Sequence, residues 1–115
     1  MTEGKKVIFV SVPMSGKDDA LIERSVQLVK QEYLKRTGLD AKEVIFYDNH
    51  RGCKNMDFSG MKIPALGYLA HAIEQLGQMD EAIFGTGWQF ARGCIIEMII
   101  CKLYGIPVRE LNRKK

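Results

Sequence analysis

Short apolar runs alternate along this chain with segments whose apolar residues recur at helical spacing. Residues 6–11 (KVIFVS) form a run rich in β-branched and aromatic side chains, which predicts a buried strand. Between a candidate N-cap at Asp18 or Asp19 and a stop at Gly38, the spacing of apolar residues predicts an amphipathic helix. The residues that recur every three or four positions in this segment are Ile22, Val26, Val29 and Tyr33.

The middle of the chain repeats this alternation. Residues 43–47 (EVIFY) predict a second strand, and the polar, glycine-containing segment 48–62 predicts a loop. A loop of that length is commonly functional. Apolar residues then return at helical spacing from Pro64, which suits a first helical turn, up to Gly77, and they predict a second helix.

The last third of the chain predicts one more strand, helix and strand. Residues 81–84 (EAIF) predict a strand, 85–90 a turn, 91–104 a strongly apolar helix ended by Gly105, and 107–111 a short final strand. The full order of elements is therefore β-α-β-α-β-α-β.

This order predicts a single α/β domain over residues 1–115, a three-layer α/β/α fold of the flavodoxin-like or Rossmann-like kind. Right-handed crossovers favour a four-stranded parallel sheet with strand order 2-1-3-4. In such sheets, ligands bind at the carboxyl edge where the strand order reverses. Segments 11–17 and 85–93 meet there, and the loop from Asp48 borders them, so this edge is the predicted pocket.

Charge and hydropathy exclude two classes of partner. The chain has 17 Lys and Arg against 14 Asp and Glu, and the C-terminal Arg113, Lys114 and Lys115 account for the difference. Because no basic stripe remains, nucleic acid is not an expected partner. The apolar run 7–10 is too short for a signal peptide and a longer later run is interrupted by Glu97, so no membrane segment is expected.

Cysteine and glycine patterns argue against metal and common cofactor sites. Three cysteines without a Cys-x-x-Cys pair, together with only two histidines, predict neither a disulfide nor a metal site and favour the cytoplasm. The segment 15–17 (SGK) lacks the flanking residues of a P-loop. Gly85-x-Gly87 lacks the third glycine of a dinucleotide motif, since Phe90 stands there, so no cofactor is expected.

Glu97 is the candidate catalytic residue. It lies inside the apolar run 95–100 (IIEMII) on the last predicted helix. A glutamate on a solvated helix face is the alternative, but such a residue normally has polar neighbours one turn away. The positions three and four residues away carry Gly93, Cys94, Ile100 and Cys101. We therefore expect partial burial at the pocket, which raises the pKa of a carboxyl group unless donors satisfy it.

Other candidates surround this glutamate. Gly93 and Cys94 keep the first turns of the helix slim, so that phosphate or ribose oxygens could approach its backbone N–H groups, with close packing on the sheet as the alternative. Trp88 could stack on a nucleobase or cover the core. Arg92 could pair with the glutamate or with a phosphate. Asp48 could orient a sugar hydroxyl or protonate a base, whereas Asp80 precedes its strand and is expected to be structural.

Three blocks of residues give the chain a resemblance to a known family. They are 10–17 (VSVPMSGK), Asp48 and 87–97 (GWQFARGCIIE), with Tyr104-Gly105 closing the helix. With these blocks the chain resembles, over nearly its whole length, the nucleoside 2-deoxyribosyltransferase-like superfamily. It is most similar to a compact branch of bacterial and phage proteins.

The resemblance implies cleavage of the N-glycosidic bond of a nucleoside or nucleotide, or deoxyribosyl transfer, with Glu97 as the nucleophile. The candidate substrate-binding residues are Ser11, Pro13, Met14, Ser15, Gly16, Asp48, Gly87, Trp88, Arg92 and Gly93. Ala91 and Val12 depart from residues common in the transferases, so a protein that senses or sequesters a nucleotide without turnover is the alternative. The family and the exposed edges of a small sheet also imply at least a homodimer.

Overall fold

The computed structural model describes residues 4–14 and 16–111. Its centre is a sheet of four strands, β1 (Lys6–Ser11), β2 (Val44–Asp48), β3 (Glu81–Phe84) and β4 (Val108–Glu110). The strand order is β2-β1-β3-β4, and all neighbouring pairs are parallel. The predicted order and direction of the strands are therefore confirmed.

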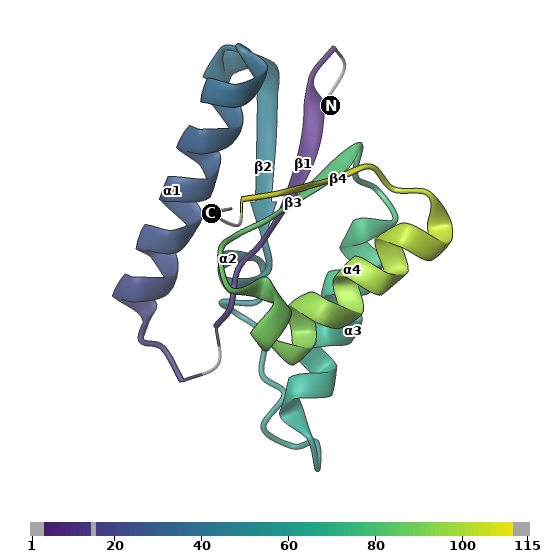
Figure 1. Ribbon diagram of the computed structural model, residues 1–115. Helices are drawn as coiled ribbons and strands as arrows, with labels where there is room; N and C mark the ends of the chain where they lie inside the picture. Colours follow the sequence, from purple (N-terminus) through teal and green to yellow (C-terminus); the bar gives the residue numbers. More distant parts are fainter. Residues whose placement is uncertain (1–3, 15, 112–115) are drawn as a thin grey trace.

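Three long helices connect the strands, as predicted. α1 (Asp19–Thr37) lies on one side of the sheet, and α3 (Pro64–Leu76) and α4 (Arg92–Tyr104) lie on the other (Figure 1). Short 3-10 helices, η1 (Ala41–Glu43) and η2 (Trp88–Phe90), precede β2 and α4. The result is the expected three-layer α/β/α arrangement.

The predicted loop 48–62 begins instead with a helix of four residues, α2 (Asn49–Gly52). Asp48 caps this helix, because its Oδ2 accepts a hydrogen bond of 3.0 Å from the backbone N–H of Arg51. A single helical turn is too short to show an apolar period, so the sequence pattern does not reveal it.

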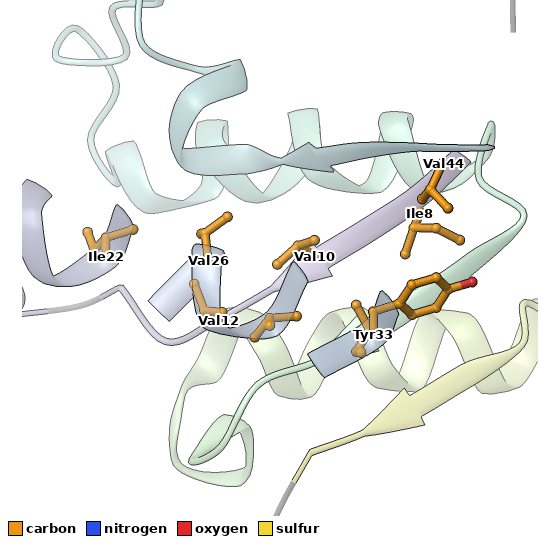
Figure 2. Packing of buried hydrophobic residues seen from close by; sticks show 9 residues of the cluster. Ile8, Val10, Val12, Ile22, Val26, Tyr33 and Val44 are labelled. Carbon is orange, nitrogen blue, oxygen red and sulfur yellow. The ribbon is translucent and has the colours of Figure 1, made fainter. Parts of the chain in front are cut away.

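One core cluster lies between the sheet and α1. Side chains alternate between the two faces of a strand, so Ile8 and Val10 of β1 both point toward this helix. The helix meets them with its four predicted apolar positions, Ile22, Val26, Val29 and Tyr33. Figure 2 shows Ile22, Val26 and Tyr33 of this set beside Ile8 and Val10. Gly38 then ends α1 in the left-handed conformation, with φ of 75°.

A second cluster lies on the opposite face of the sheet. Phe9 of β1 and Phe84 of β3 pack there against residues of α3 and α4, namely Ala72, Leu76, Cys94, Met98 and Cys101. Ser11, the last residue of β1, points to this same face because it is two positions after Phe9. Its hydroxyl group therefore meets α4 at the carboxyl edge of the sheet.

A polar cluster closes the amino edge of the sheet. The buried carboxylate of Glu81 accepts hydrogen bonds from the Tyr33 hydroxyl at 2.9 Å, from Lys6 Nζ at 3.3 Å and from Arg109 Nε. Asp80 accepts a hydrogen bond of 2.8 Å from a backbone N–H of β1, which confirms its expected structural role. Within the described residues, no helix is long and apolar enough to cross a membrane.

Candidate active site

A pocket of about 710 Å³ lies at the carboxyl edge of the sheet, beside the end of β1. This volume is typical of small-molecule sites, and the edge is the one that the fold predicts. Much of the wall is apolar and includes Met14, Ile22, Met56, Ile63, Leu66, Leu69 and Ile96. The polar and charged residues of the wall include Ser11, Asp19, Asp48, Asn49, His50, Lys54, Arg92 and Glu97.

Glu97, on the second turn of α4, lines this pocket from a nearly buried position. Only 7% of the residue is exposed, which excludes the solvated helix face. Its Oε1 accepts a hydrogen bond of 2.7 Å from the Ser11 hydroxyl. No side chain of residues 4–14 and 16–111 donates to Oε2, so this oxygen is available to a ligand. Burial raises the pKa of Glu97 to about 7, against the opposing effect of the Ser11 hydrogen bond.

Ser11 contacts both Glu97 and Cys94. Its Oγ lies 2.7 Å from the glutamate oxygen and 3.1 Å from Cys94 Sγ. A hydroxyl group has one proton, and the shorter bond, to the carboxylate, is the stronger. Burial raises the pKa of Cys94 to about 11, so the thiol keeps its proton near neutral pH. Ser11 therefore positions the glutamate as well as lining the pocket.

Tyr47 and Asn49 fix the wall that α2 forms. The Tyr47 hydroxyl donates to Asn49 Oδ1 at 3.0 Å, and Asn49 Nδ2 donates to the backbone carbonyl of Tyr68 at 2.9 Å. Glycine is required at position 52, since a Cβ on Gly52 would lie 2.1 Å from the Tyr47 hydroxyl oxygen. Burial raises the pKa of Tyr47 to about 12. These contacts hold α2 between β2 and α3.

His50 and Asp19 connect α2 to the first turn of α1. His50 Nε2 lies 3.5 Å from Asp19 Oδ1. The His50 side chain is 18% exposed, whereas that of Asp19 is 82% exposed, and both residues line the pocket. This wall therefore holds an imidazole with a carboxylate beside it.

The structure brings six of the predicted site residues together. The six that line the pocket are Ser11, Met14, Asp48, Arg92, Gly93 and Glu97. Pro13 and Gly87 instead line a neighbouring hollow of about 720 Å³ beside α1, and Val12 and Ala91 form the divide between the two. Gly16 is exposed and lies outside the pocket wall, and Ser15 lies outside the described residues. Pro13, Gly16 and Gly87 are therefore not in the wall of the pocket that holds Glu97, and their substrate contacts stay predictions.

Arg92 and Gly93 begin α4. The Arg92 guanidinium forms no ion pair with Glu97 or with any other described residue, which leaves it available to an anion. A Cβ on Gly93 would meet no atom within 4 Å, so packing on the sheet does not require glycine there. Ala91, the N-cap, provides no side-chain hydrogen bond to this turn.

Trp88 packs in the core beside α4. Its ring centroid lies 5.7 Å from that of Phe84, and its indole N–H is buried without a hydrogen-bond partner in the described part of the chain. The side chain is absent from the pocket wall because η2 turns it onto β3. This position supports the alternative of a cover for the core, and stacking of Trp88 on a ligand stays a prediction.

Apolar periodicity does not single out three polar residues of the wall, namely Asn49, His50 and Cys53. Their position does point to them, because Asn49 and His50 directly follow β2 at the carboxyl edge, where ligands bind in parallel sheets, and Cys53 ends the same helical turn. An irregular loop over 48–62 gives no reason to expect fixed side chains, so these residues are not among the predicted site residues. The cap at Asp48 is what turns these side chains into a fixed wall.

The wall of the pocket includes two thiols, those of Cys53 and Cys94. Across residues 4–14 and 16–111, no group of three or more His, Cys, Asp or Glu side chains is placed to hold a metal ion. Cys53, Cys94 and Cys101 are buried free thiols.

Comparison of the chain with protein-family models, with curated proteins and with solved structures finds no match.

Proposed function

We propose that this pocket binds a nucleoside or nucleotide and that Glu97 attacks the anomeric carbon of its sugar, which breaks the N-glycosidic bond. The observation that carries the proposal is the nearly buried carboxyl group of Glu97, with one oxygen held by Ser11 and the other available to the pocket. Burying a carboxylate without a cation costs stability, so its position favours a chemical role. The resemblance to the nucleoside 2-deoxyribosyltransferase-like superfamily supports the same assignment.

The proposed reaction has two steps. First, an electron pair of Glu97 Oε2 forms a bond to C1′ while the C1′–N bond breaks through an oxocarbenium-like state. Water or an acceptor base then attacks C1′ and releases the carboxylate, which gives hydrolysis or deoxyribosyl transfer. Ser11 supports this chemistry by fixing Oε1, so that the carboxylate is oriented before the substrate binds.

The wall of the pocket suits the parts of such a substrate. Its apolar side chains favour a flat nucleobase. Asp48 caps α2 through Oδ2, and Oδ1 is left to accept a hydrogen bond from a sugar hydroxyl. Arg92 suits a 5′-phosphate, because its guanidinium is not engaged by an acidic side chain of the described chain.

We also infer that the protein works in the cytoplasm as a homo-oligomer. Its three buried free thiols are compatible with a reducing compartment. Large apolar side chains on the outer face of α4, including Ile99 and Leu103, are half or more exposed and favour contact with a second copy.

Base release by purified protein tests the proposed reaction. Wild type, Glu97→Gln and Glu97→Ala are incubated with deoxynucleosides, their 5′-monophosphates and NAD, and the released base is measured by chromatography. We expect release by wild type alone, with a pentosyl adduct visible by intact-protein mass. Equal background release from all three proteins would exclude the reaction for those substrates. Tight calorimetric binding in that case would favour a protein that holds a nucleotide without turnover.

A further inference from the structure

The proposed reaction needs a proton donor for the departing base, and the inference drawn here rests on that proposed function. A nucleobase leaves poorly as an anion, and a positioned general acid contributes about 10²–10⁴-fold to such steps. In retaining glycosidases the acid and the nucleophile flank the scissile bond. The donor is therefore expected in the same pocket, on the side away from α4.

Several proton-bearing groups near the glutamate are poor donors. Ser11 gives its proton to Glu97. Burial raises the pKa of Cys94 to about 11 and that of Tyr47 to about 12, so both groups release their protons reluctantly. Asp48, the donor that the sequence suggests, is fixed as a hydrogen-bond acceptor at the cap of α2 and is better suited to receive a bond from a sugar hydroxyl.

His50 lines the pocket on the required side. It follows β2, which pairs with one edge of β1, whereas α4 follows β3, which pairs with the other edge. His50 and Glu97 therefore flank the end of β1 from opposite sides, within one pocket wall. The other charged or titratable residues of that wall are Asp19, Asp48, Cys53, Lys54, Tyr68, Arg92 and Cys94.

Asp19 places a carboxylate beside the imidazole of His50. The 3.5 Å contact between Asp19 Oδ1 and His50 Nε2 engages one ring nitrogen and leaves Nδ1 for a ligand. A base or acid oriented by a carboxylate is a recurrent catalytic arrangement. Because the His50 side chain is 18% exposed, it can still exchange protons with solvent between turnovers.

We propose that His50 is the catalytic acid of this pocket, that it donates the Nδ1 proton to the departing nucleobase, and that Asp19 is its positioning residue. As the electron pair of the C1′–N bond moves to the base nitrogen, that nitrogen takes the proton and His50 becomes neutral. Water, the co-reactant, then gives its oxygen to C1′ and a proton to His50. Glu97 departs from C1′ as a carboxylate, so both catalytic groups return to their starting states.

Paired substrates that differ in the leaving base test this assignment. 7-Methyl-2′-deoxyguanosine carries a cationic base that departs neutral without a proton donor, whereas 2′-deoxyguanosine needs the donor. We expect His50→Gln to lower kcat/KM for 2′-deoxyguanosine by about 100-fold, a typical loss for a general acid, and by less than about fivefold for the 7-methyl compound. For pyrimidine nucleosides, the matching pair is 2′-deoxyuridine and 5-fluoro-2′-deoxyuridine, whose base is the better leaving group.

His71→Gln is the matched control, because His71 has a similarly buried side chain with an acidic neighbour, Glu74 at 3.9 Å, but lies on α3 outside the pocket wall. We expect it to keep wild-type rates on both members of each pair. Asp19→Asn should lower kcat/KM for 2′-deoxyguanosine, by less than His50→Gln does, because the imidazole then lacks the carboxylate beside Nε2. It should leave the 7-methyl compound nearly unaffected.

The outcomes separate the two assignments. Glu97→Gln should slow both members of a pair equally. Equal losses on both members in His50→Gln would overturn the role of His50 and leave the nucleophile in place. Release of no base by wild type from any nucleoside of the two pairs would overturn the proposed function together with the acid.

Discussion

The hydroxyl group of Ser11 donates a hydrogen bond of 2.7 Å to Oε1 of Glu97, and this bond joins the end of β1 to α4. The two residues are 86 positions apart in the chain, so only the assembled sheet and helix create the contact. A carboxyl group in this position would otherwise be desolvated without compensation. The bond both orients the carboxylate and lowers the cost of its charge.

Ser11→Ala should raise the pKa of Glu97 further above about 7, because the hydroxyl is the donor that opposes the effect of burial. The measurement is the titration of the Glu97 carboxyl carbon by NMR. Ser25→Ala, on α1 and outside this pocket wall, is the control and should leave the titration unchanged. A titration midpoint that does not move in Ser11→Ala would mean that the hydrogen bond contributes nothing in solution.

Glu97→Gln should stabilise the protein at pH 8 and have little effect at pH 5. Burial raises the pKa of Glu97 from the ordinary 4.5 to about 7, so the folded state holds the proton more tightly than the unfolded chain does. The free energy of unfolding of wild type therefore falls as pH rises from about 4.5 to about 7 and is level above that range. The full difference is about 3 kcal/mol, since one pKa unit corresponds to about 1.4 kcal/mol.

Urea denaturation at the two pH values measures this difference. Glutamine keeps the size of the protonated side chain, so packing is preserved and the comparison isolates the charge. A stability gain in Glu97→Gln that is the same at pH 5 and pH 8 would contradict the explanation from a buried charge.

The amino edge offers a test of stability that is separate from the pocket. Glu81→Ala leaves the buried Tyr33 hydroxyl without its acceptor, and we expect a loss of about 1–3 kcal/mol in the free energy of unfolding. Tyr33→Phe should cost about 1 kcal/mol. The double variant should lose less than the sum, because the two residues share one hydrogen bond. Strict additivity in urea denaturation would argue against that shared contact.

The sequence predicts the framework of this protein because its strands and long helices have clear apolar periods. The first core cluster contains apolar residues of the run 6–11 together with the helical residues Ile22, Val26, Val29 and Tyr33. Strand order follows from the handedness of crossovers, which needs only the order of elements. The burial of Glu97 is also predictable, since its neighbours one turn away are apolar or small.

The wall around Glu97 is less predictable, because it depends on single hydrogen bonds and on the direction of short turns. The α2 turn exists through the cap at Asp48, and it is this turn that places His50 beside Asp19. Trp88 follows β3 closely in sequence, yet η2 directs its ring into the core instead of the pocket. Neither feature has a period that a sequence pattern could show.

The outer surface of α4 predicts a homodimer. Ile99 and Leu103 lie one turn apart there, and Leu103 is 74% exposed. Tyr104, next to Leu103, is 77% exposed, so the apolar surface continues to the end of α4.

A charge placed in this apolar surface should oppose the association of two copies. Leu103→Glu should therefore give a monomer by light scattering, because a buried, unpaired carboxylate opposes association. Leu28→Glu, at a 59% exposed position on α1, is the control and should leave the dimer intact. A monomeric mass for wild type at working concentrations would contradict this assembly, and dissociation by Leu28→Glu instead would move the interface to α1.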